Sequence, residues 1–181
     1  ALFPTALAVP TVETAAQTLA ALDIMVGDDS GNLMLDRAVT RAEFTKMTIA
    51  ASIYGDGAGS ETTISPYPDV PYTHWAASYI ATAVEAGYVT GYLDGTFRPN
   101  HTITLAEGVT MALRLLGYGN ADFSGAYPSG QMAMYRALKL NEGVTAASNT
   151  TTLTRRDAMA LFYNLLTAAN KGGQIYLTTL G

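Results

Sequence analysis

The chain has 181 residues, of which 49% are hydrophobic and 14% charged, and its formal net charge is −5, so it is long enough for one domain or a few small units with a buried core. It contains no cysteine, which excludes disulfides, thiolate zinc sites and cysteine nucleophiles. The acidic balance gives no overall support for binding nucleic acid or an anionic membrane, and no apolar run approaches the ~18–20 residues of a spanning helix, so we expect neither nucleic-acid binding nor membrane insertion.

The first clear helix start lies in residues 39–44, which read VTRAEF. Thr40 and Glu43 have the spacing of a capping box, in which the threonine hydroxyl accepts from the backbone N–H three residues later and the glutamate reaches back. The box predicts a helix that begins at Arg41. A cation there opposes the helix macrodipole by about 0.3–1 kcal/mol, so Arg41 requires a reason other than helix formation.

The sequence repeats itself at a shift of 64 residues, where residues 3–54 align with residues 67–118 without a gap. The identical pairs include Pro4 and Pro68, Gly27 and Gly91, Gly31 and Gly95, Thr40 and Thr104, Ala42 and Ala106, Glu43 and Glu107, Met47 and Met111, and Tyr54 and Tyr118. A looser third copy has Leu153–Asp157 in the place of the box and Gly143 in the place of Gly91. The pattern predicts three copies of one unit, at residues 1–55, 66–118 and 121–170, and a tail at 171–181.

Each unit is predicted to fold as a helix, a glycine-rich loop and a second helix. In unit two, the stretch WAASYIATAVEAGY has apolar residues at three- and four-residue spacing, typical of one buried helical face, and the loop GYLDGTFRPN carries turn signals and Phe97 as a core anchor. The second helices have apolar stripes, which comprise Val109, Ala112, Leu113 and Leu116 in unit two and Met159, Phe162, Tyr163 and Leu166 in unit three. One unit cannot bury its apolar face alone, so we expect a mostly α fold in which three units pack together.

Residues 67–118, YPDVPYTHWAASYIATAVEAGYVTGYLDGTFRPNHTITLAEGVTMALRLLGY, resemble a bacterial S-layer homology domain. The matching positions are Tyr67, Asp69 and Val70 at the opening, Trp75 before the first helix, Gly87, Gly91, Asp94, Gly95, Phe97 and Pro99 around the loop, and the box. Three tandem copies are usual in this family, and the resemblance covers roughly residues 3–170.

The resemblance implies a pseudo-threefold helical bundle of a secreted cell-surface protein. Grooves between neighbouring units would hold a secondary cell wall polysaccharide, often pyruvylated, and the arginine of the box, the family's best-known contact to the acidic sugar, corresponds to Arg41 and Arg155. This implies a non-covalent anchoring module of the cell wall or S-layer rather than an enzyme. It also implies no cofactor, no metal and a monomer as an isolated module.

The sequence departs from the family pattern in each unit. Leu105 takes the arginine position of unit two, Thr5 and Thr11 stand where unit one should have aspartate and tryptophan, and Tyr127 and Asp157 replace tryptophan and glutamate in unit three. We therefore expect one or two competent grooves rather than three, with the groove that relies on Leu105 silent.

Arg41 and Arg155 have two interpretations. Free backbone N–H groups at a helix start form an anion site with which a guanidinium can cooperate, and its planar fork suits a carboxylate such as pyruvate or uronate. The alternative is an arginine that pairs with an acidic neighbour or is solvated. Thr40 and Thr154 serve first as helix caps, and as neighbours of the arginines they belong to the candidate ligand-binding set.

Trp75 and Asp69 complete that set. Trp75, the only tryptophan, either packs in the core or stacks on a sugar ring, whose C–H groups match an aromatic face. Asp69 either forms an Asx-type turn ahead of Trp75 or accepts a hydrogen bond from a sugar hydroxyl. His74 and His101 lie in loop positions without a metal-ligand partner, so we expect both to be exposed.

The alternative to wall anchoring is a cell-surface scaffold module that binds proteins and has lost glycan binding, as Leu105 indicates for one groove. A glycan-processing enzyme has less support. Its carboxylate pair would be Glu43 and Glu107, but these occupy equivalent capping positions in separate units.

Overall fold

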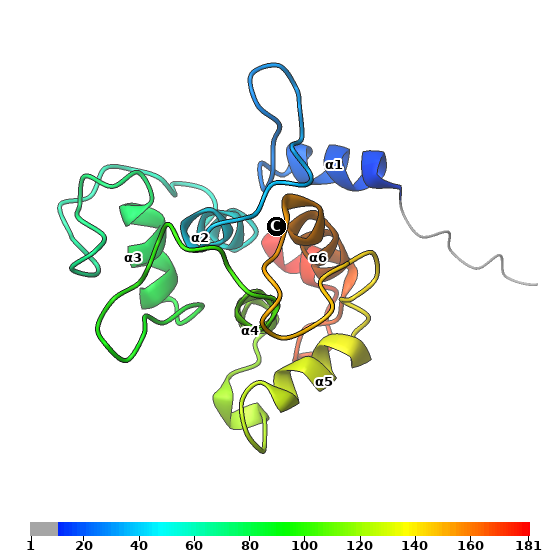
Figure 1. Cartoon of the computed structure of the whole chain (residues 1–181). Coiled ribbons are helices and arrows are strands. Elements are labelled where there is room, and N and C mark those ends of the chain that lie inside the picture. Colours follow the sequence, from blue (N-terminus) through cyan, green and yellow to red (C-terminus); the bar gives the residue numbers. More distant parts are fainter. Residues whose placement is uncertain (1–10) are drawn as a thin grey trace, which may run out of the picture.

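The structure, a computed structural model, describes residues 11–181 and is mostly α, as predicted (Figure 1). The elements are α1 Val12–Ala21, α2 Arg41–Ala50, α3 Ala77–Glu85, α4 Leu105–Leu115, α5 Ser129–Ala137 and α6 Arg155–Thr167, with 3₁₀ turns η1 Asn120–Asp122 and η2 Tyr176–Leu180. Within residues 11–181, extended segments pair only through isolated bridges and form no sheet. No helix in this part of the chain is long and apolar enough to cross a membrane. Thr5, one of the departures noted above, lies outside the described residues.

Helices α2, α4 and α6 each begin at a complete capping box, which confirms the predicted starts. In each box the threonine hydroxyl accepts from the backbone N–H three residues later, and the acidic side chain accepts from the threonine N–H. The three pairs are Thr40 with Glu43, Thr104 with Glu107, and Thr154 with Asp157. Aspartate thus replaces glutamate in the third box without loss of the reciprocal bonds.

The segments before the three boxes meet in a closed ring of backbone hydrogen bonds. The N–H of Val39 donates to the carbonyl of Leu153, that of Leu153 to Ile103, and that of Ile103 to Val39, each at 2.9 Å. All three side chains are fully buried. The ring sets the starts of α2, α4 and α6 around one point, and Figure 1 shows these helices inside and α1, α3 and α5 outside.

Each outer helix packs against the inner helix that precedes it in this ring. Helix α3 packs on α2, α5 packs on α4, and α1 packs on α6. The first and last α-helices of residues 11–181 therefore lie against each other. The apolar helical faces predicted from the sequence are therefore buried against helices of another predicted unit. This arrangement explains why a single unit cannot bury its own apolar face.

The core contains the side chains that the helical pattern predicts. Phe97 and all four stripe residues of α4 are buried, and in α6 only Tyr163 of the predicted stripe is partly exposed. At the centre, the rings of Phe44 and Phe162 lie 5.0 Å apart between centroids. Gly108 makes room for them, since a Cβ atom there would lie 2.7 Å from Cδ1 of Leu153 and 3.2 Å from Cζ of Phe44.

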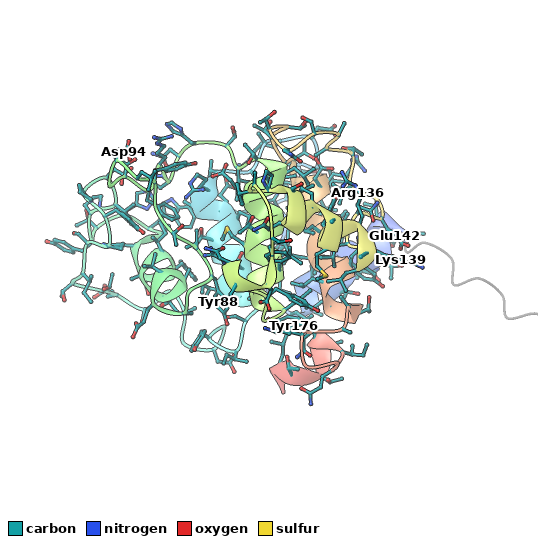
Figure 2. The ribbon with its side chains drawn as sticks, turned by 90° about the horizontal axis from the view of Figure 1, so that it is seen from below. Tyr88, Asp94, Arg136, Lys139, Glu142 and Tyr176 are labelled. Carbon is teal, nitrogen blue, oxygen red and sulfur yellow. The ribbon has the colours of Figure 1, made fainter. Side chains whose placement is uncertain are left out.

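Residues 171–181, predicted as a tail, pack against the helical body. The Tyr176 side chain is buried (Figure 2), and its hydroxyl donates to the carbonyl of Ala51 at 2.5 Å. The backbone N–H of Lys171 donates to the carbonyl of Leu116 at 2.8 Å, and the Lys171 ammonium donates to the Asp122 carboxylate at 2.6 Å. This segment therefore contributes to the packed structure.

Candidate functional site

The backbone N–H groups at the starts of α2 and α6 are already occupied. The N–H of Arg41 donates to the carbonyl of His101 and the N–H of Arg155 donates to that of Arg37, both at 2.8 Å, and the next N–H in each helix donates to another loop carbonyl at 2.9 Å. The expectation of free N–H groups for an anion is therefore wrong. The loop of the neighbouring unit supplies acceptors that satisfy these helix-end donors.

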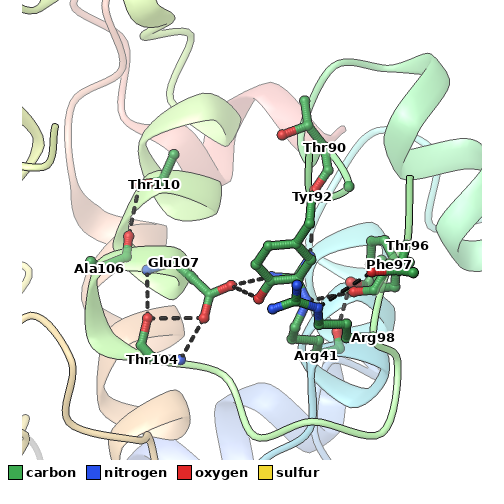
Figure 3. Close-up of polar contacts among 12 residues, drawn as sticks. Arg41, Thr90, Tyr92, Thr96, Phe97, Arg98, Thr104, Ala106, Glu107 and Thr110 are labelled. Atoms are coloured by element: carbon green, nitrogen blue, oxygen red, sulfur yellow. Dashed lines mark hydrogen bonds and ion pairs between the residues drawn. The ribbon is translucent and has the colours of Figure 1, made fainter. Parts of the chain in front are cut away.

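Arg41 is buried at the start of α2, with 4% of its surface exposed. Figure 3 shows its polar contacts with the loop before α4 and with Glu107. Its Nε donates to the carbonyl of Phe97 at 2.8 Å, its Nη2 to that of Thr90 at 3.4 Å, and its Nη1 to the carboxylate of Glu107. The rings of Tyr92 and Phe97 lie 4.6 and 4.7 Å from the guanidinium carbon. The alternative interpretation, an arginine paired with an acidic neighbour, describes Arg41.

Glu107 is the acidic partner and also completes the capping box of α4. Burial by itself would raise the pKa of Glu107, but the Tyr92 hydroxyl (2.7 Å), the Arg41 charge and the bonds from Thr104 together lower it. The carboxylate is therefore ionised at neutral pH, and its charge is compensated inside the protein.

Arg155 occupies the equivalent position at the start of α6, with 7% exposure. Its Nε donates to the carbonyl of Leu33 and its Nη2 to that of Val26, both at 2.8 Å, and these acceptors are 64 residues before those of Arg41. Its Nη1 has no hydrogen-bond or carboxylate partner among residues 11–181. One edge of the Arg155 guanidinium is thus available to a ligand.

The electrostatic surroundings of Arg155 come from the same unit as its carbonyl acceptors. Burial lowers the pKa of Arg155, the neighbouring Arg37 charge lowers it as well, and Glu43 raises it. Glu43, the counterpart of Glu107, pairs with Arg37 and not with Arg155. The guanidinium is a very strong base, so it keeps its positive charge at neutral pH.

A cavity of about 460 Å³ opens beside Arg155, and we call it the first groove. It brings together three of the predicted site residues, Thr40 and Arg155 at the starts of α2 and α6 and Trp75 ahead of α3. Its charged lining residues are the cations Arg37, Lys46 and Arg155 and the anions Asp23 and Glu43. Cations exceed anions in this groove, although the protein as a whole is acidic.

Trp75 lies at the edge of the first groove with 54% of its surface exposed, so the core-packing interpretation is wrong. The His74 ring stacks on it, with centroids 5.7 Å apart and planes at 29°. The His74 Nδ1 accepts from the N–H of Ala76 at 3.0 Å. His74 is half-buried by these contacts, contrary to expectation, whereas His101 is exposed as predicted.

Asp69 and Thr154 have structural roles. The Asp69 carboxylate accepts from the N–H groups of Phe97 at 2.9 Å and Arg98 at 2.8 Å, and so holds the loop before α4 rather than a turn ahead of Trp75. The Thr154 hydroxyl accepts from the N–H of Asp157 at 3.2 Å. Neither residue is among those lining the first groove.

The second groove, with a volume of about 280 Å³, has Arg41, Glu107 and Tyr127 in the positions of Arg155, Glu43 and Trp75. A smaller cavity of about 150 Å³ includes Thr11, which corresponds to Trp75 in the repeat. Leu105, in the arginine position, is buried at 3% exposure and offers no charge. The grooves therefore differ in volume, charge and aromatic edge.

Two lining residues of the first groove, Arg37 and Lys46, were absent from the predicted set. The alignment at a shift of 64 residues places them opposite His101 and Thr110. Comparing the charges of aligned positions, and not only the shared motif, would have identified both.

Comparison with known proteins places these features in a wider context. The S-layer homology domain model matches residues 8–45 and 66–107. The middle cell wall protein of Brevibacillus brevis is 30% identical over 155 residues, 86% of this chain and 14% of that protein. Cell surface glycoprotein 1 of Acetivibrio thermocellus is 40% identical over 94 residues, 50% of this chain and 4% of that protein. The cellulosome-anchoring protein of the same organism is 37% identical over 93 residues, 51% of this chain and 21% of that protein.

The chain thus spans a small part of each of these relatives. Both matched segments end inside a helix that starts with a capping box, and these helices contribute Glu43 to the first groove and Glu107 to the second. Residues 8–45 and 66–107 thus match the S-layer homology domain, within a chain that is similar to parts of cell-surface and cell-wall proteins.

Proposed function

We propose that this chain anchors a protein to the bacterial cell wall by binding an anionic wall polysaccharide non-covalently in the first groove, and that it has no catalytic role. The S-layer homology segments and the similarity to cell-wall and cell-surface proteins support anchoring at the cell surface. The cationic lining of the groove supports an anionic polymer, and the resemblance to S-layer homology domains favours a pyruvate ketal as its acidic group.

The observation that carries the proposal is the free Nη1 edge of Arg155 at the wall of a cavity that also contains Arg37 and Lys46. A guanidinium binds a carboxylate through charge-assisted hydrogen bonds, which are stronger than neutral ones. The exposed indole of Trp75 supplies an apolar face for the C–H side of a sugar ring. Together these groups match an acidic sugar residue.

We further propose that residues 121–170 form a third unit of the same kind, alongside units at 1–55 and 66–118. Helix α6 starts with the same box, and Leu153 closes the backbone ring with Val39 and Ile103. The first groove needs this unit, because it supplies Arg155.

The test is co-sedimentation of the protein with purified Gram-positive cell walls, before and after mild acid removes pyruvate. We expect the wild-type protein to sediment with untreated walls and to stay in solution with treated walls. Arg155→Ala should lose binding, and Arg156→Ala, which removes a neighbouring cation that pairs loosely with Asp36 at 3.7 Å, is the matched control that should keep it. Equal sedimentation of wild-type protein and Arg155→Ala would contradict the proposal.

A further inference from the structure

The first and second grooves use the same atoms of the box glutamate in different ways. In both, Oε1 accepts from the N–H of the capping threonine, at 3.3 Å for Glu43 and 3.2 Å for Glu107. The other oxygen, Oε2, accepts from Arg37 in the first groove and from Arg41 in the second. The partner of Oε2 therefore decides whether the box arginine at the groove wall is neutralised.

Arg37 in the first groove and His101 in the second occupy equivalent positions of the repeat. Their backbone carbonyls make the same contact, each accepting from the first N–H of an inner helix at 2.8 Å. The Arg37 side chain is half-exposed and reaches Glu43, whereas His101 forms no ion pair with any carboxylate of residues 11–181. Without a competing cation, Glu107 pairs with Arg41.

We propose that Arg37 is the residue that assigns anion binding to the first groove, because it holds the Glu43 carboxylate away from Arg155 and leaves Nη1 of Arg155 free for the ligand. The proposal rests on the proposed function, which supplies the anionic ligand. It adds a specificity-determining role for a residue outside the box.

The position of Glu43 matters for ligand binding because its carboxylate and the ligand carboxylate would compete for the Arg155 guanidinium. A carboxylate of the protein that already pairs with a buried guanidinium repels a second carboxylate and occupies the hydrogen-bond donors that the ligand needs. In the second groove the Tyr92 hydroxyl also donates to Oε2 of Glu107 at 2.7 Å and fixes it beside Arg41. In the first groove Glu43 lies near enough to Arg155 to raise the pKa of Arg155. Glu43 can therefore become the ion-pair partner of Arg155 once Arg37 is removed.

The other charged groups of the first groove do not replace Arg37 in this role. Lys46 and Asp23 line the cavity, but neither forms an ion pair with Glu43 or Arg155 among the described residues. Lys46 instead lies 5.8 Å from the ring centroid of Tyr79. Arg37 is thus the cation that controls the position of the glutamate.

The experiment compares Arg37→His, which copies the second groove, with the double variant Arg37→His/Glu43→Gln. Glutamine keeps the capping box but carries no charge to neutralise Arg155. Binding of a disaccharide with a pyruvate ketal is measured by calorimetry, and crystal structures of both variants are determined without sugar. His101→Ala is the matched control at the equivalent position of the second groove.

We expect Arg37→His to weaken binding by about tenfold or more, since one hydrogen bond to a charged group corresponds to a change of that size. The double variant should recover most of the affinity, His101→Ala should bind as the wild-type protein does, and the Arg37→His structure should show Glu43 on Arg155. If Glu43 stays away from Arg155, or if the double variant binds as weakly as the single one, the role of Arg37 is wrong. If the wild-type protein does not bind the pyruvylated sugar, the proposed function fails, while the sugar-free structures still test the position of Glu43.

Discussion

Replacing Arg41 with alanine should destabilise the fold more than the equivalent replacement of Arg155. Arg41→Ala removes the partner of a carboxylate whose side chain is only 22% exposed. Breaking a buried ion pair from one side typically costs about 3–5 kcal/mol, and the partial exposure of Glu107 places this case near 3 kcal/mol. Both variants lose two hydrogen bonds to loop carbonyls, but only Arg41→Ala also strands a carboxylate, so we expect Arg155→Ala to lose about 3 kcal/mol less.

The assay is urea unfolding of each variant, followed by far-ultraviolet circular dichroism, with Glu107→Gln and the double variant Arg41→Ala/Glu107→Gln completing a cycle. The double variant should be more stable than Arg41→Ala, because the stranded charge is gone. Equal free energies of unfolding for Arg41→Ala and Arg155→Ala would refute the assignment of Arg41 as a buried structural pair.

The ion pair of Arg41 and Glu107 predicts how the free energy of unfolding changes with pH. The pKa of Glu107 is lowered from its usual 4.5 in the folded protein. Its contribution to stability is therefore present above about pH 4.5 and is lost as the pH falls through the folded pKa. In Arg41→Ala the carboxylate is stranded, and its protonation relieves the penalty. The gap in unfolding free energy between wild-type protein and Arg41→Ala should thus narrow below about pH 4.5 in the same assay, and a gap that widens would contradict it.

Three further substitutions test the core, the C-terminal segment and the groove edge. Gly108→Ala should lower the free energy of unfolding by about 1–2 kcal/mol, because overpacking against Leu153 and Phe44 outweighs the gain in helix propensity. Adding Phe44→Leu to Gly108→Ala should restore part of the lost free energy of unfolding. Tyr176→Phe should cost about 1 kcal/mol by removing the hydrogen bond to Ala51, measured by thermal unfolding, and an unchanged midpoint would contradict a packed C-terminal segment. Trp75→Ala should change stability by less than about 1 kcal/mol, since the indole is exposed, yet abolish co-sedimentation with walls.

The features that the sequence predicts well are local ones. A capping box needs only residues three apart, so the starts of α2, α4 and α6 follow directly from Thr40, Thr104 and Thr154. The apolar stripes give the buried faces by the same logic. The pairing of α3 with α2 and of α1 with α6 has no local signature, because it depends on how the starts of α2, α4 and α6 close a ring.

The fates of the two box arginines could not be read from the motif either. Arg41 and Arg155 both directly follow a capping threonine, but the box glutamate pairs with Arg41 in the second groove and with Arg37 in the first. Arg37 and His101 lie in loops, and each precedes the box glutamate of its own helix, Glu43 or Glu107, by six residues. The motif alone does not show which cation each box glutamate contacts, because the arginine comes from a loop in one groove and from another helix in the other.

A crystal structure of the protein with a pyruvylated disaccharide would show directly whether the first groove binds the sugar. We predict sugar in the first groove, with the pyruvate carboxylate bound to Nη1 of Arg155 and a sugar ring against Trp75. A carboxylate bound to Arg41 in the second groove, with the Glu107 pair broken and the first groove empty, would contradict it.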